Sequence, residues 1–324
     1  MVAVQGYQLR LAVCLHRRSE MYDVVIVGGG PAGLSAALIL GRCRRRVLVC
    51  DAGAPRNRAA AAIHGFLTRD GTPPLDLLRL GRDELRSYGI DVRHATVTAV
   101  ERKAEEFAVT IGTSERVQAQ SVLLATGVCD QLPAIPGVSD CYGISVHHCP
   151  YCDGWEHRDE PLAVIGRGQN AAGLALSLKT WSERVTLCTH GPARLSRRQA
   201  TQLAERRVVV RTERIERLEH ENGRASRLTF DPAADPVACR AVFLSLPQAQ
   251  QSEFAQRLGC EFTRKGAVKT DHLGKTCVPG VYVVGDASRD VQFAIVAAAE
   301  GAKAGVAINK ALQERVGLAI QVEN

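Results

Sequence analysis

YDVVIVGGGPAGL, at residues 22–34, joins an apolar run to a glycine-rich turn. Residues 22–27 are rich in valine and isoleucine, as expected for a parallel strand that is buried on both faces. Gly28, Gly30 and Gly33 follow with the spacing G-x-G-x-x-G. This spacing lets the phosphates of a ligand approach the backbone closely, but by itself it is a weak signal.

The residues after the turn complete the pattern of a dinucleotide-binding unit. A helix is expected over residues 34–42 and a second strand over residues 47–50, which ends in Asp51. Unpaired N–H groups at a helix N-terminus attract a pyrophosphate, and a carboxylate after the second strand can accept hydrogen bonds from a ribose. Strand, glycine turn, helix, strand and acid in this order predict a dinucleotide site.

A second unit of the same type lies in the middle of the chain. Residues 161–165 predict a strand, and Gly166, Gly168 and Ala171 give the spacing G-x-G-x-x-A. A further helix and strand are expected within residues 172–188. The repeat predicts an α/β chain with two nucleotide sites.

Cys149 and Cys152 lie between the two glycine motifs and form a CxxC pair, which Asp153 follows directly. Such a pair can cycle between a dithiol and a disulfide, and the neighbouring carboxylate can move protons. A zinc site is the alternative, with further ligands available in Cys141, His147, His148 and His157. The chain has no second CxxC and a nucleotide motif stands on each side of the pair, so we expect a redox centre and no metal.

His147 and His148 immediately precede the CxxC pair. A histidine at this place can act as a base that deprotonates a thiol near neutral pH, and His148 is our candidate for that role. The alternative is that both are ordinary loop histidines.

The C-terminal part of the chain carries another strand and helix. Residues 280–286 predict a strand that ends in Gly285 and Asp286, and an alanine-rich helix is expected over residues 292–312. A carboxylate between a strand and a helix can bind the hydroxyl groups of a ligand. The alternative is that Asp286 caps the helix.

The remaining segments are assigned from periodicity and turn residues. We expect a loop over 53–74, a helix over 74–88, antiparallel strands over 92–100 and 107–111, a strand over 120–125, and further strands within 206–246. Proline-rich breaks at 132–137 and 247–248 predict two hinges between domains.

The size and composition are those of a soluble enzyme with two domains. Of the 324 residues, 46% are hydrophobic and 23% charged. No apolar run reaches the roughly 20 residues of a membrane helix. The basic residues behind the net charge of +7 are dispersed, so neither a membrane nor a nucleic acid is an expected partner. Eleven cysteines without a secretory signal favour a reducing, cytoplasmic compartment, and residues 1–20 are expected to be an N-terminal extension.

Five motifs in a fixed order carry a family resemblance. They are G-x-G-x-x-G, Ala-Thr-Gly at 125–127, Cys-x-x-Cys-Asp-Gly at 149–154, G-x-G-x-x-A and Gly-Asp at 285–286. With this combination, over about residues 21–320, the chain resembles the low-molecular-weight thioredoxin reductases and their flavoprotein relatives.

The resemblance implies an architecture of two Rossmann-like three-layer nucleotide-binding domains, the second inserted into the first. Residues 21–131 and 249–324 would form a discontinuous FAD-binding domain. Residues 132–248 would form a pyridine-nucleotide-binding domain that carries the CxxC. A homodimer and a large rotation between the domains are also implied.

The resemblance further implies which residues hold the cofactors. The FAD site would comprise Gly28, Gly30, Pro31, Ala32, Gly33, Asp51, Ala125, Thr126, Gly127, Gly285, Asp286, Gln292, Phe293 and Ala294. Within this set, Asp51 would bind the adenosine ribose and Asp286 the ribityl chain. The NADPH or NADH site would comprise Gly166, Gly168 and Ala171.

The resemblance also implies catalytic roles around the CxxC pair. Cys152 would face the flavin, and Cys149 would attack the disulfide of the substrate. Asp153 would donate the proton of the dithiol step.

Two departures from the family pattern concern the electron donor and the flavin. NADPH-selecting members carry His-Arg-Arg after the second strand of the nucleotide domain, where residues 190–192 read His-Gly-Pro. The arginines that would grip the 2′-phosphate are therefore missing there, although Arg194, Arg197 and Arg198 follow and could substitute. Residues 291–294 read VQFA, which keeps the glutamine of the family's Arg-Gln-Ala and loses its arginine.

Three functions are compatible with these features. In the first, electrons pass from NAD(P)H to FAD, to the Cys149–Cys152 pair, and on to a thioredoxin-like protein or a small disulfide. The second is similar to the flavin-dependent dithiol oxidases of natural-product pathways, in which electrons run from a small dithiol to flavin and oxygen without a nicotinamide. The third is a non-catalytic redox sensor. The intact CxxC-Asp argues against the third. The intact second glycine turn favours the first, whereas the missing His-Arg-Arg favours the second or a reductase with an unusual electron donor.

Overall fold

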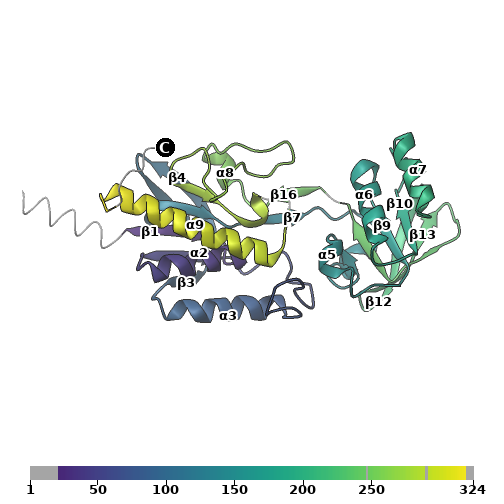
Figure 1. Cartoon of the computed structure of the whole chain (residues 1–324), viewed down its shortest axis with the longest axis horizontal. Coiled ribbons are helices and arrows are strands. Elements are labelled where there is room, and N and C mark those ends of the chain that lie inside the picture. The colour runs from purple at the N-terminus through teal and green to yellow at the C-terminus, as the bar shows by residue number, and fades with distance from the viewer. Residues whose placement is uncertain (1–20, 246, 289–290, 319–324) are drawn as a thin grey trace, which may run out of the picture. The chain divides into compact units, whose positions relative to one another are not determined.

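The computed structural model describes residues 21–245, 247–288 and 291–318, which form two compact units (Figure 1). The first unit combines the chain up to Arg56, Leu75–Cys129, and the chain from Gln250 onward. The second unit combines Asn57–Pro74 with Asp130–Ala249. The extension predicted for residues 1–20 lies outside the described residues.

The strand that precedes the glycine motif lies inside the sheet of the first unit. Its seven strands are β1 (Tyr22–Val27), β2 (Val47–Asp51), β3 (Asp91–His94), β4 (Val97–Lys103), β5 (Glu106–Ile111), β6 (Glu115–Leu124) and β17 (Val281–Val283). β1 lies between β2 and β6, and both pairings are parallel. β3 and β17 extend this parallel part, while β4 and β5 form an antiparallel ribbon that continues from β6.

The single strand expected over residues 92–100 is wrong. The chain turns between β3 and β4, because Val92 pairs in parallel with Val49 whereas Val97 pairs in antiparallel with Ile111. One straight strand cannot serve both partners, and the apolar alternation of the segment does not reveal the turn.

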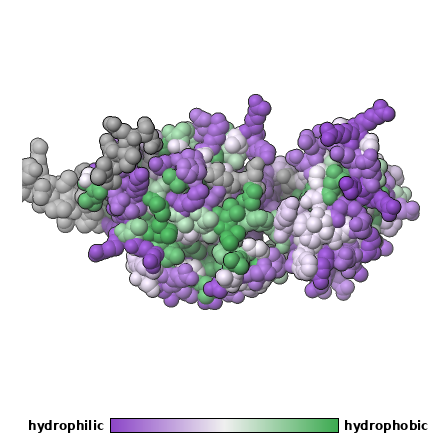
Figure 2. All heavy atoms as spheres, in the orientation of Figure 1, coloured by the Kyte–Doolittle hydropathy of each residue, from purple (hydrophilic) through white to green (hydrophobic). Residues whose placement is uncertain are grey.

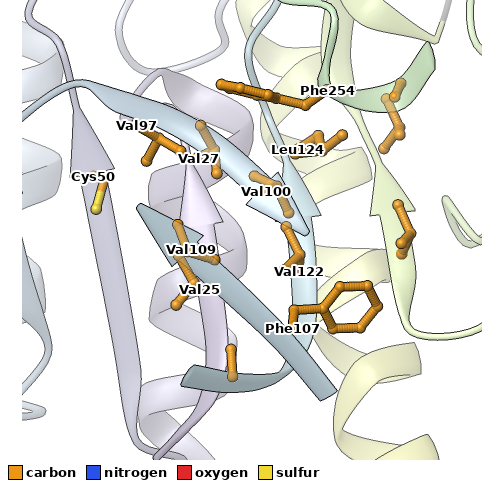
Figure 3. Packing of buried hydrophobic residues seen from close by; sticks show 14 of the residues in the cluster. Val25, Val27, Cys50, Val97, Val100, Phe107, Val109, Val122, Leu124 and Phe254 are labelled. Atoms are coloured by element: carbon orange, nitrogen blue, oxygen red, sulfur yellow. The ribbon is translucent and has the colours of Figure 1, made fainter. Parts of the chain in front are cut away.

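The valines and isoleucine of β1 divide between two cores. Val24 and Ile26 pack with the helices on one face of the sheet. Val25 and Val27 pack on the other face with side chains of the β4–β5 ribbon, among them Val109 (Figure 3). Burial on both faces explains why this strand is apolar throughout rather than alternating.

Helices of the first unit hold the glycine turn against the C-terminal segment. They are α2 (Pro31–Arg42), α3 (Pro74–Arg86), α8 (Phe254–Arg257) and α9 (Ala294–Arg315), with a 3₁₀ turn η1 (Gly285–Ala287) before α9. A Cβ at Gly301 of α9 would lie 1.9 Å from the carbonyl oxygen of Ala32, so α2 and α9 approach closely only because residue 301 is glycine. This contact brings the two predicted parts of the flavin site into one unit.

The second unit has three layers around a parallel sheet. Its strands are β8 (Val146–His147), β9 (Leu162–Ile165), β10 (Val185–Cys188), β11 (Val209–Arg211) and β15 (Ala241–Leu244), in the order β11-β10-β9-β15-β8. Helices α6 (Gly168–Leu178) and α7 (Arg197–Glu205) contribute to the layer on one side. The other side carries a small sheet of β12 (Arg214–Glu221), β13 (Arg224–Asp231) and β14 (Val237–Ala238).

Two short strands mark where the chain passes between the units. β7 (Val128–Asp130) and β16 (Gln248–Gln250) pair with each other. Beside them the Gln131 N–H donates to the Pro247 carbonyl at 3.4 Å. The sequence predicted its hinges near these passages, at 132–137 and 247–248, but not that the passing segments would form a ribbon.

The loop after β2 differs from expectation, because residues 57–74 belong with the second unit rather than with the flavin domain. His64 Nε2 lies 3.4 Å from Glu156 Oε1, and a Cβ at Gly143 would lie 2.7 Å from that of Ala59. These are polar and close backbone contacts, which leave no periodic signal in the sequence. Among the described residues no helix has the length and apolar character needed to cross a membrane.

Candidate functional site

The first glycine turn has the shape of a phosphate cradle. A Cβ at Gly28 would lie 2.3 Å from the Ala125 carbonyl oxygen, and one at Gly33 would lie 1.9 Å from the Gly28 carbonyl oxygen. The backbone packing around this turn therefore leaves no room for a side chain at Gly28 or at Gly33. A Cβ at Gly30 would meet nothing within 4 Å, so the middle glycine opens to space at the start of α2. Pro31 takes the first helical position, where its missing N–H costs nothing.

Asp51 lies against this turn, at the end of β2. Its Oδ1 accepts the Gly53 N–H at 3.0 Å, and its Oδ2 lies 2.8 Å from Arg82 Nη2. A carboxylate has about four acceptor positions, so these two partners leave capacity for a ribose. The sequence did not point to Arg82, since a lone arginine on the exposed side of an amphipathic helix carries no motif.

The segment of residues 125–127 continues β6 beside the glycine turn. The Ala125 N–H donates to the Val27 carbonyl at 2.8 Å, which places this predicted site residue next to Gly28. Gly127 has a φ of +69°, a conformation that disfavours side chains with a Cβ. The geometry around the first turn fits a bound dinucleotide.

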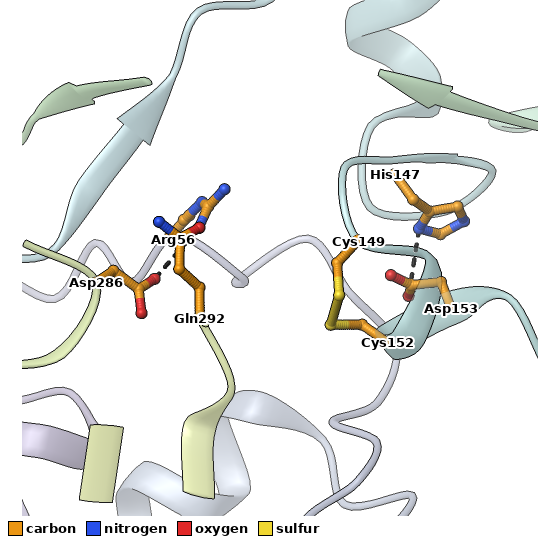
Figure 4. The surroundings of a disulfide bond; sticks show 7 residues. All are labelled: Arg56, His147, Cys149, Cys152, Asp153, Asp286 and Gln292. Carbon is orange, nitrogen blue, oxygen red and sulfur yellow. Dashed lines mark hydrogen bonds and ion pairs between the residues drawn. A yellow bond between two sulfur atoms is a disulfide. The ribbon is translucent and has the colours of Figure 1, made fainter. Parts of the chain in front are cut away.

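Asp286 and Gln292 meet at one side chain that sequence reasoning missed (Figure 4). Arg56 Nη1 lies 3.2 Å from Asp286 Oδ2 and donates to Gln292 Oε1 at 2.6 Å. The Arg56 side chain is only 14% exposed. Phe293 occupies the N-cap position of α9, which has no side-chain cap, so the alternative that Asp286 caps this helix is wrong.

Gly285 completes this corner of the first unit. It has a φ of +72°, and its N–H donates to Glu300 Oε2 at 2.9 Å. Ala294 begins α9 directly after Phe293. The predicted C-terminal contacts to the flavin thus lie together, and Arg56 from the loop after β2 joins them.

The CxxC pair is a closed disulfide in the second unit (Figure 4). Cys149 precedes the one-turn helix α5 (Pro150–Asp153), and the Cα atoms of Cys149 and Cys152 are 5.3 Å apart. The Cys149 carbonyl accepts the N–H groups of Cys152 and Asp153 at 3.2 and 3.3 Å. Proline at the first helical position and these two bonds hold the turn that places the sulfur atoms together.

Asp153 contacts His147 rather than His148, our candidate base. His147 Nδ1 lies 3.3 Å from Asp153 Oδ1, and the His147 side chain is 6% exposed (Figure 4). On its other side, His147 Nε2 lies 3.0 Å from Nε2 of His157. Burial and, to a lesser extent, the nearby His147 lower the pKa of His157 to about 4, while Asp153 opposes the shift. The role of His148 stays a prediction.

The second glycine turn is partly covered by its own chain. The Gly166 N–H donates to the Cys188 carbonyl at 3.3 Å, as the Gly28 N–H does to the Cys50 carbonyl at 2.8 Å. The Gly168 N–H donates to the Ala193 carbonyl at 2.9 Å. Gly30 stands at the equivalent place in the first turn, and its N–H makes no hydrogen bond to any described residue.

The segment after β10 is held against this turn by a further arginine. Arg167 Nε donates to the Thr189 carbonyl at 2.7 Å, and its Nη2 donates to the His190 carbonyl. The arginines that could replace the missing pair, Arg194, Arg197 and Arg198, are exposed around the start of α7. Within the described residues no group of three or more His, Cys, Asp and Glu side chains could hold a metal ion.

Comparison with known proteins covers nearly the whole chain. The family model described as pyridine nucleotide-disulphide oxidoreductase matches residues 22–301. A protein of Arthroderma benhamiae named "Probable thioredoxin reductase" is 32% identical over 303 residues, which span 83% of this chain and 74% of that protein.

Two solved structures show the same likeness in three dimensions. The structure of HlmI has a TM-score of 0.88 at 37% identity, over 92% of this chain and 94% of HlmI. An oxidoreductase from Agrobacterium tumefaciens has a TM-score of 0.85 at 34% identity, over 91% of this chain and 99% of that one.

Proposed function

We propose a function from the premise that the chain belongs to the pyridine nucleotide-disulphide oxidoreductase family and is a thioredoxin reductase-like, FAD-dependent disulfide oxidoreductase. In this proposal electrons pass from NAD(P)H through FAD to the Cys149–Cys152 pair, and then to a thioredoxin-like protein or a small disulfide. The observation that carries the proposal is the closed Cys149–Cys152 disulfide, which Asp153 follows directly in the chain and where His147 contacts Asp153.

Residues of the first unit would hold the flavin cofactor. Bound FAD supplies two-electron chemistry, because a flavin accepts a hydride and passes an electron pair to a disulfide. The open face at Gly30 would receive the pyrophosphate, since unpaired N–H groups at a helix start attract anions. Asp51 would accept hydrogen bonds from the ribose. Asp286 and Gln292, joined by Arg56, would contact the ribityl chain and the ring.

The chemistry at the cysteine pair is a thiol–disulfide exchange. The Cys149 thiolate attacks one sulfur of the substrate disulfide and releases a thiolate from it. The Cys152 thiolate then attacks the Cys149 sulfur, which closes the Cys149–Cys152 disulfide and releases the second substrate thiolate. Asp153 takes up and returns the proton of Cys152, and Nδ1 of His147 lies 3.3 Å from its carboxylate.

A flavin-dependent dithiol oxidase is the second candidate, and a specific observation favours it. The Gly168 N–H, which a nucleotide phosphate would use, is occupied by the Ala193 carbonyl. A carbonyl oxygen at this position also repels an anion. Together with His-Gly-Pro at 190–192, this arrangement favours a protein that takes electrons from a small dithiol instead of a nicotinamide.

An anaerobic half-reaction separates the two candidates. The FAD-loaded protein is mixed with NADPH, NADH or a small dithiol in separate cuvettes, and the yellow flavin band is followed. Bleaching by a nicotinamide nucleotide supports the reductase and identifies its donor. Bleaching by the dithiol alone, with recovery in air, supports the oxidase. The Cys149→Ser protein is the control, since it retains FAD but loses the path to the dithiol.

The partners and the compartment belong to the same proposal. We propose a homodimer, because hydrophobic residues gather over α9 in the first unit (Figure 2) and Val306 of that helix is 58% exposed. Light scattering on the FAD-loaded protein tests this against the chain mass of 35.0 kDa. We propose a cytoplasmic location, since eight cysteines of the described chain besides Cys149 and Cys152 are thiols.

A further inference from the structure

Three titratable side chains, beginning with the residue that follows the CxxC pair, contact one another in a line. Asp153 directly follows Cys152, and its Oδ1 lies 3.3 Å from Nδ1 of His147. The opposite ring nitrogen of His147, Nε2, lies 3.0 Å from Nε2 of His157. Each nitrogen of His147 therefore meets a group that can exchange a proton.

The fold holds His147 in one place. It lies on β8, where it pairs with Phe243 of the buried strand β15, and the two rings are 5.6 Å apart. With 6% of its side chain exposed, the ring has no room to turn toward water. A buried polar ring is stable only when its nitrogens are paired. Here both partners are ionisable, whereas backbone groups would have sufficed for packing.

We propose that His147 and His157 form a proton relay that carries the proton exchanged by Asp153 between the cysteine pair and solvent. The inference rests on the thiol–disulfide chemistry proposed above. It assigns His147 and His157 as positioning and proton-carrying residues, since neither of them is the nucleophile.

Protons and electrons balance when the reduced pair is oxidised. The reduced pair reacts as the Cys149 thiolate and the Cys152 thiol. Together they lose two electrons to the disulfide acceptor as the Cys149–Cys152 bond forms, the S–S bond of the acceptor breaks to release two thiolates, and the proton of Cys152 goes to Asp153. Asp153 passes its proton to Nδ1 of His147, while the proton on Nε2 of His147 moves to Nε2 of His157. His157 then releases its Nδ1 proton to water. Reduction of the pair runs the same steps in reverse.

The environment of His157 suits the outer end of such a relay. Its ring is partly exposed, and burial together with His147 lowers its pKa to about 4. A histidine with this pKa is uncharged near neutral pH, so it accepts a proton only transiently and passes it on. A group that kept the proton would block the next turnover.

The test isolates the second thiol step from any nicotinamide or natural substrate. Exposed thiols of the FAD-loaded protein, such as Cys43 and Cys277, are first blocked while the disulfide is closed. The pair is then reduced and mixed with dithiodipyridine in a stopped-flow instrument. Release of the second thiopyridone reports the attack by Cys152, which requires loss of its proton.

The key variant is His157→Gln, because a glutamine can still pair with His147 but cannot relay a proton. We expect its second release to be about tenfold slower in weak buffer, since general acid–base catalysis contributes at least this much. Added imidazole should restore the rate by carrying the proton. His220→Gln is the matched control, as His220 lies 3.5 Å from Asp140 in the same unit but does not contact Asp153, and it should react like the wild type.

Two results would overturn the relay. One is a His157→Gln protein that reacts at the wild-type rate; the other is a slow variant that imidazole leaves slow, which would make His157 a packing residue. If the variant does not fold, the wild-type rate in mixtures of water and deuterium oxide decides. A curved plot of the rate against the deuterium fraction means that several protons move in the same step, as the relay requires. A linear plot contradicts the relay. Failure of the flavin half-reaction would affect only the proposed function.

Discussion

Arg56 is the residue that most changes the predicted flavin site. The sequence suggested that the arginine contact of the family was lost at residue 291, while the glutamine beside it was kept. In the structure, Arg56 from a different part of the chain donates a hydrogen bond to Gln292, and the same guanidinium contacts Asp286.

Replacing Arg56 by alanine is expected to weaken FAD binding. Loss of a hydrogen bond to a charged group costs about 2 kcal/mol, which corresponds to a Kd roughly 30-fold higher. The ratio of flavin to protein absorbance after gel filtration, followed by titration of the apoprotein with FAD, measures the effect.

Arg69→Ala is the matched control for this prediction. Arg69 is an exposed arginine from the loop that follows Arg56, and its Nη1 donates to the neighbouring Thr68 carbonyl. We expect it to keep its flavin. Equal flavin retention in the two variants would exclude Arg56 from the cofactor site.

At the scale of elements, the contact between α2 and α9 assembles the first unit. The glycine turn stands at the start of α2, and Gln292 stands just before α9. Small residues along both helices let the backbones approach, and Gly301 is the closest point. Side-chain volume at this crossing therefore decides whether the two halves of the proposed flavin site meet.

Gly301→Ala is expected to destabilise the first unit and to reduce its flavin content. The added Cβ would lie 1.9 Å from the Ala32 carbonyl oxygen, and such overpacking costs about 3 kcal/mol. Chemical denaturation, followed by circular dichroism and by flavin fluorescence, measures both effects.

Gly173→Ala, on a helix of the second unit, is expected to stabilise the protein, in contrast to Gly301→Ala. A Cβ at Gly173 of α6 would meet nothing within 4 Å, so alanine should raise the free energy of unfolding by about 1 kcal/mol through helix propensity. If both glycine variants unfold alike, helix propensity rather than the close contact would be the dominant effect at residue 301.

At the scale of the whole molecule, the line of Asp153, His147 and His157 makes stability depend on pH. His157 has a pKa of about 4 in the folded chain, against 6.5 as its ordinary value. Between these values the unfolded chain binds the extra proton, so the free energy of unfolding falls as the pH is lowered from 6.5 to 4. Because the His157 ring is only partly buried, solvent screening makes this loss of stability smaller than the full pKa difference would give.

We expect His157→Gln to flatten this part of the pH profile. Denaturant midpoints at several pH values between 4 and 7, compared with the wild type, measure the difference, because the other titrating groups are common to both proteins. Parallel profiles would mean that His157 is not shielded from solvent in the folded protein.

Much of the fold could be predicted, because the two glycine motifs follow local rules. The strand before Gly28, the helix after it and Asp51 lie where their spacing predicted them, and the unit around Gly166 repeats the arrangement. The CxxC pair was likewise visible, since its chemistry depends on residues three apart. The turn after β3 and the placement of residues 57–74 were not predicted, because they depend on pairing partners distant in sequence.

The sequence by itself determined the α/β class, the two nucleotide motifs and the redox pair, because each depends on the types and spacing of near neighbours. Only the tertiary structure decided that Arg56 joins Asp286 and Gln292, that His147 rather than His148 contacts Asp153, and that Ala193 occupies the Gly168 N–H. These contacts join residues that the chain brings together through sheet pairing and helix packing. Their geometry follows from the whole arrangement of elements, and no local pattern encodes it.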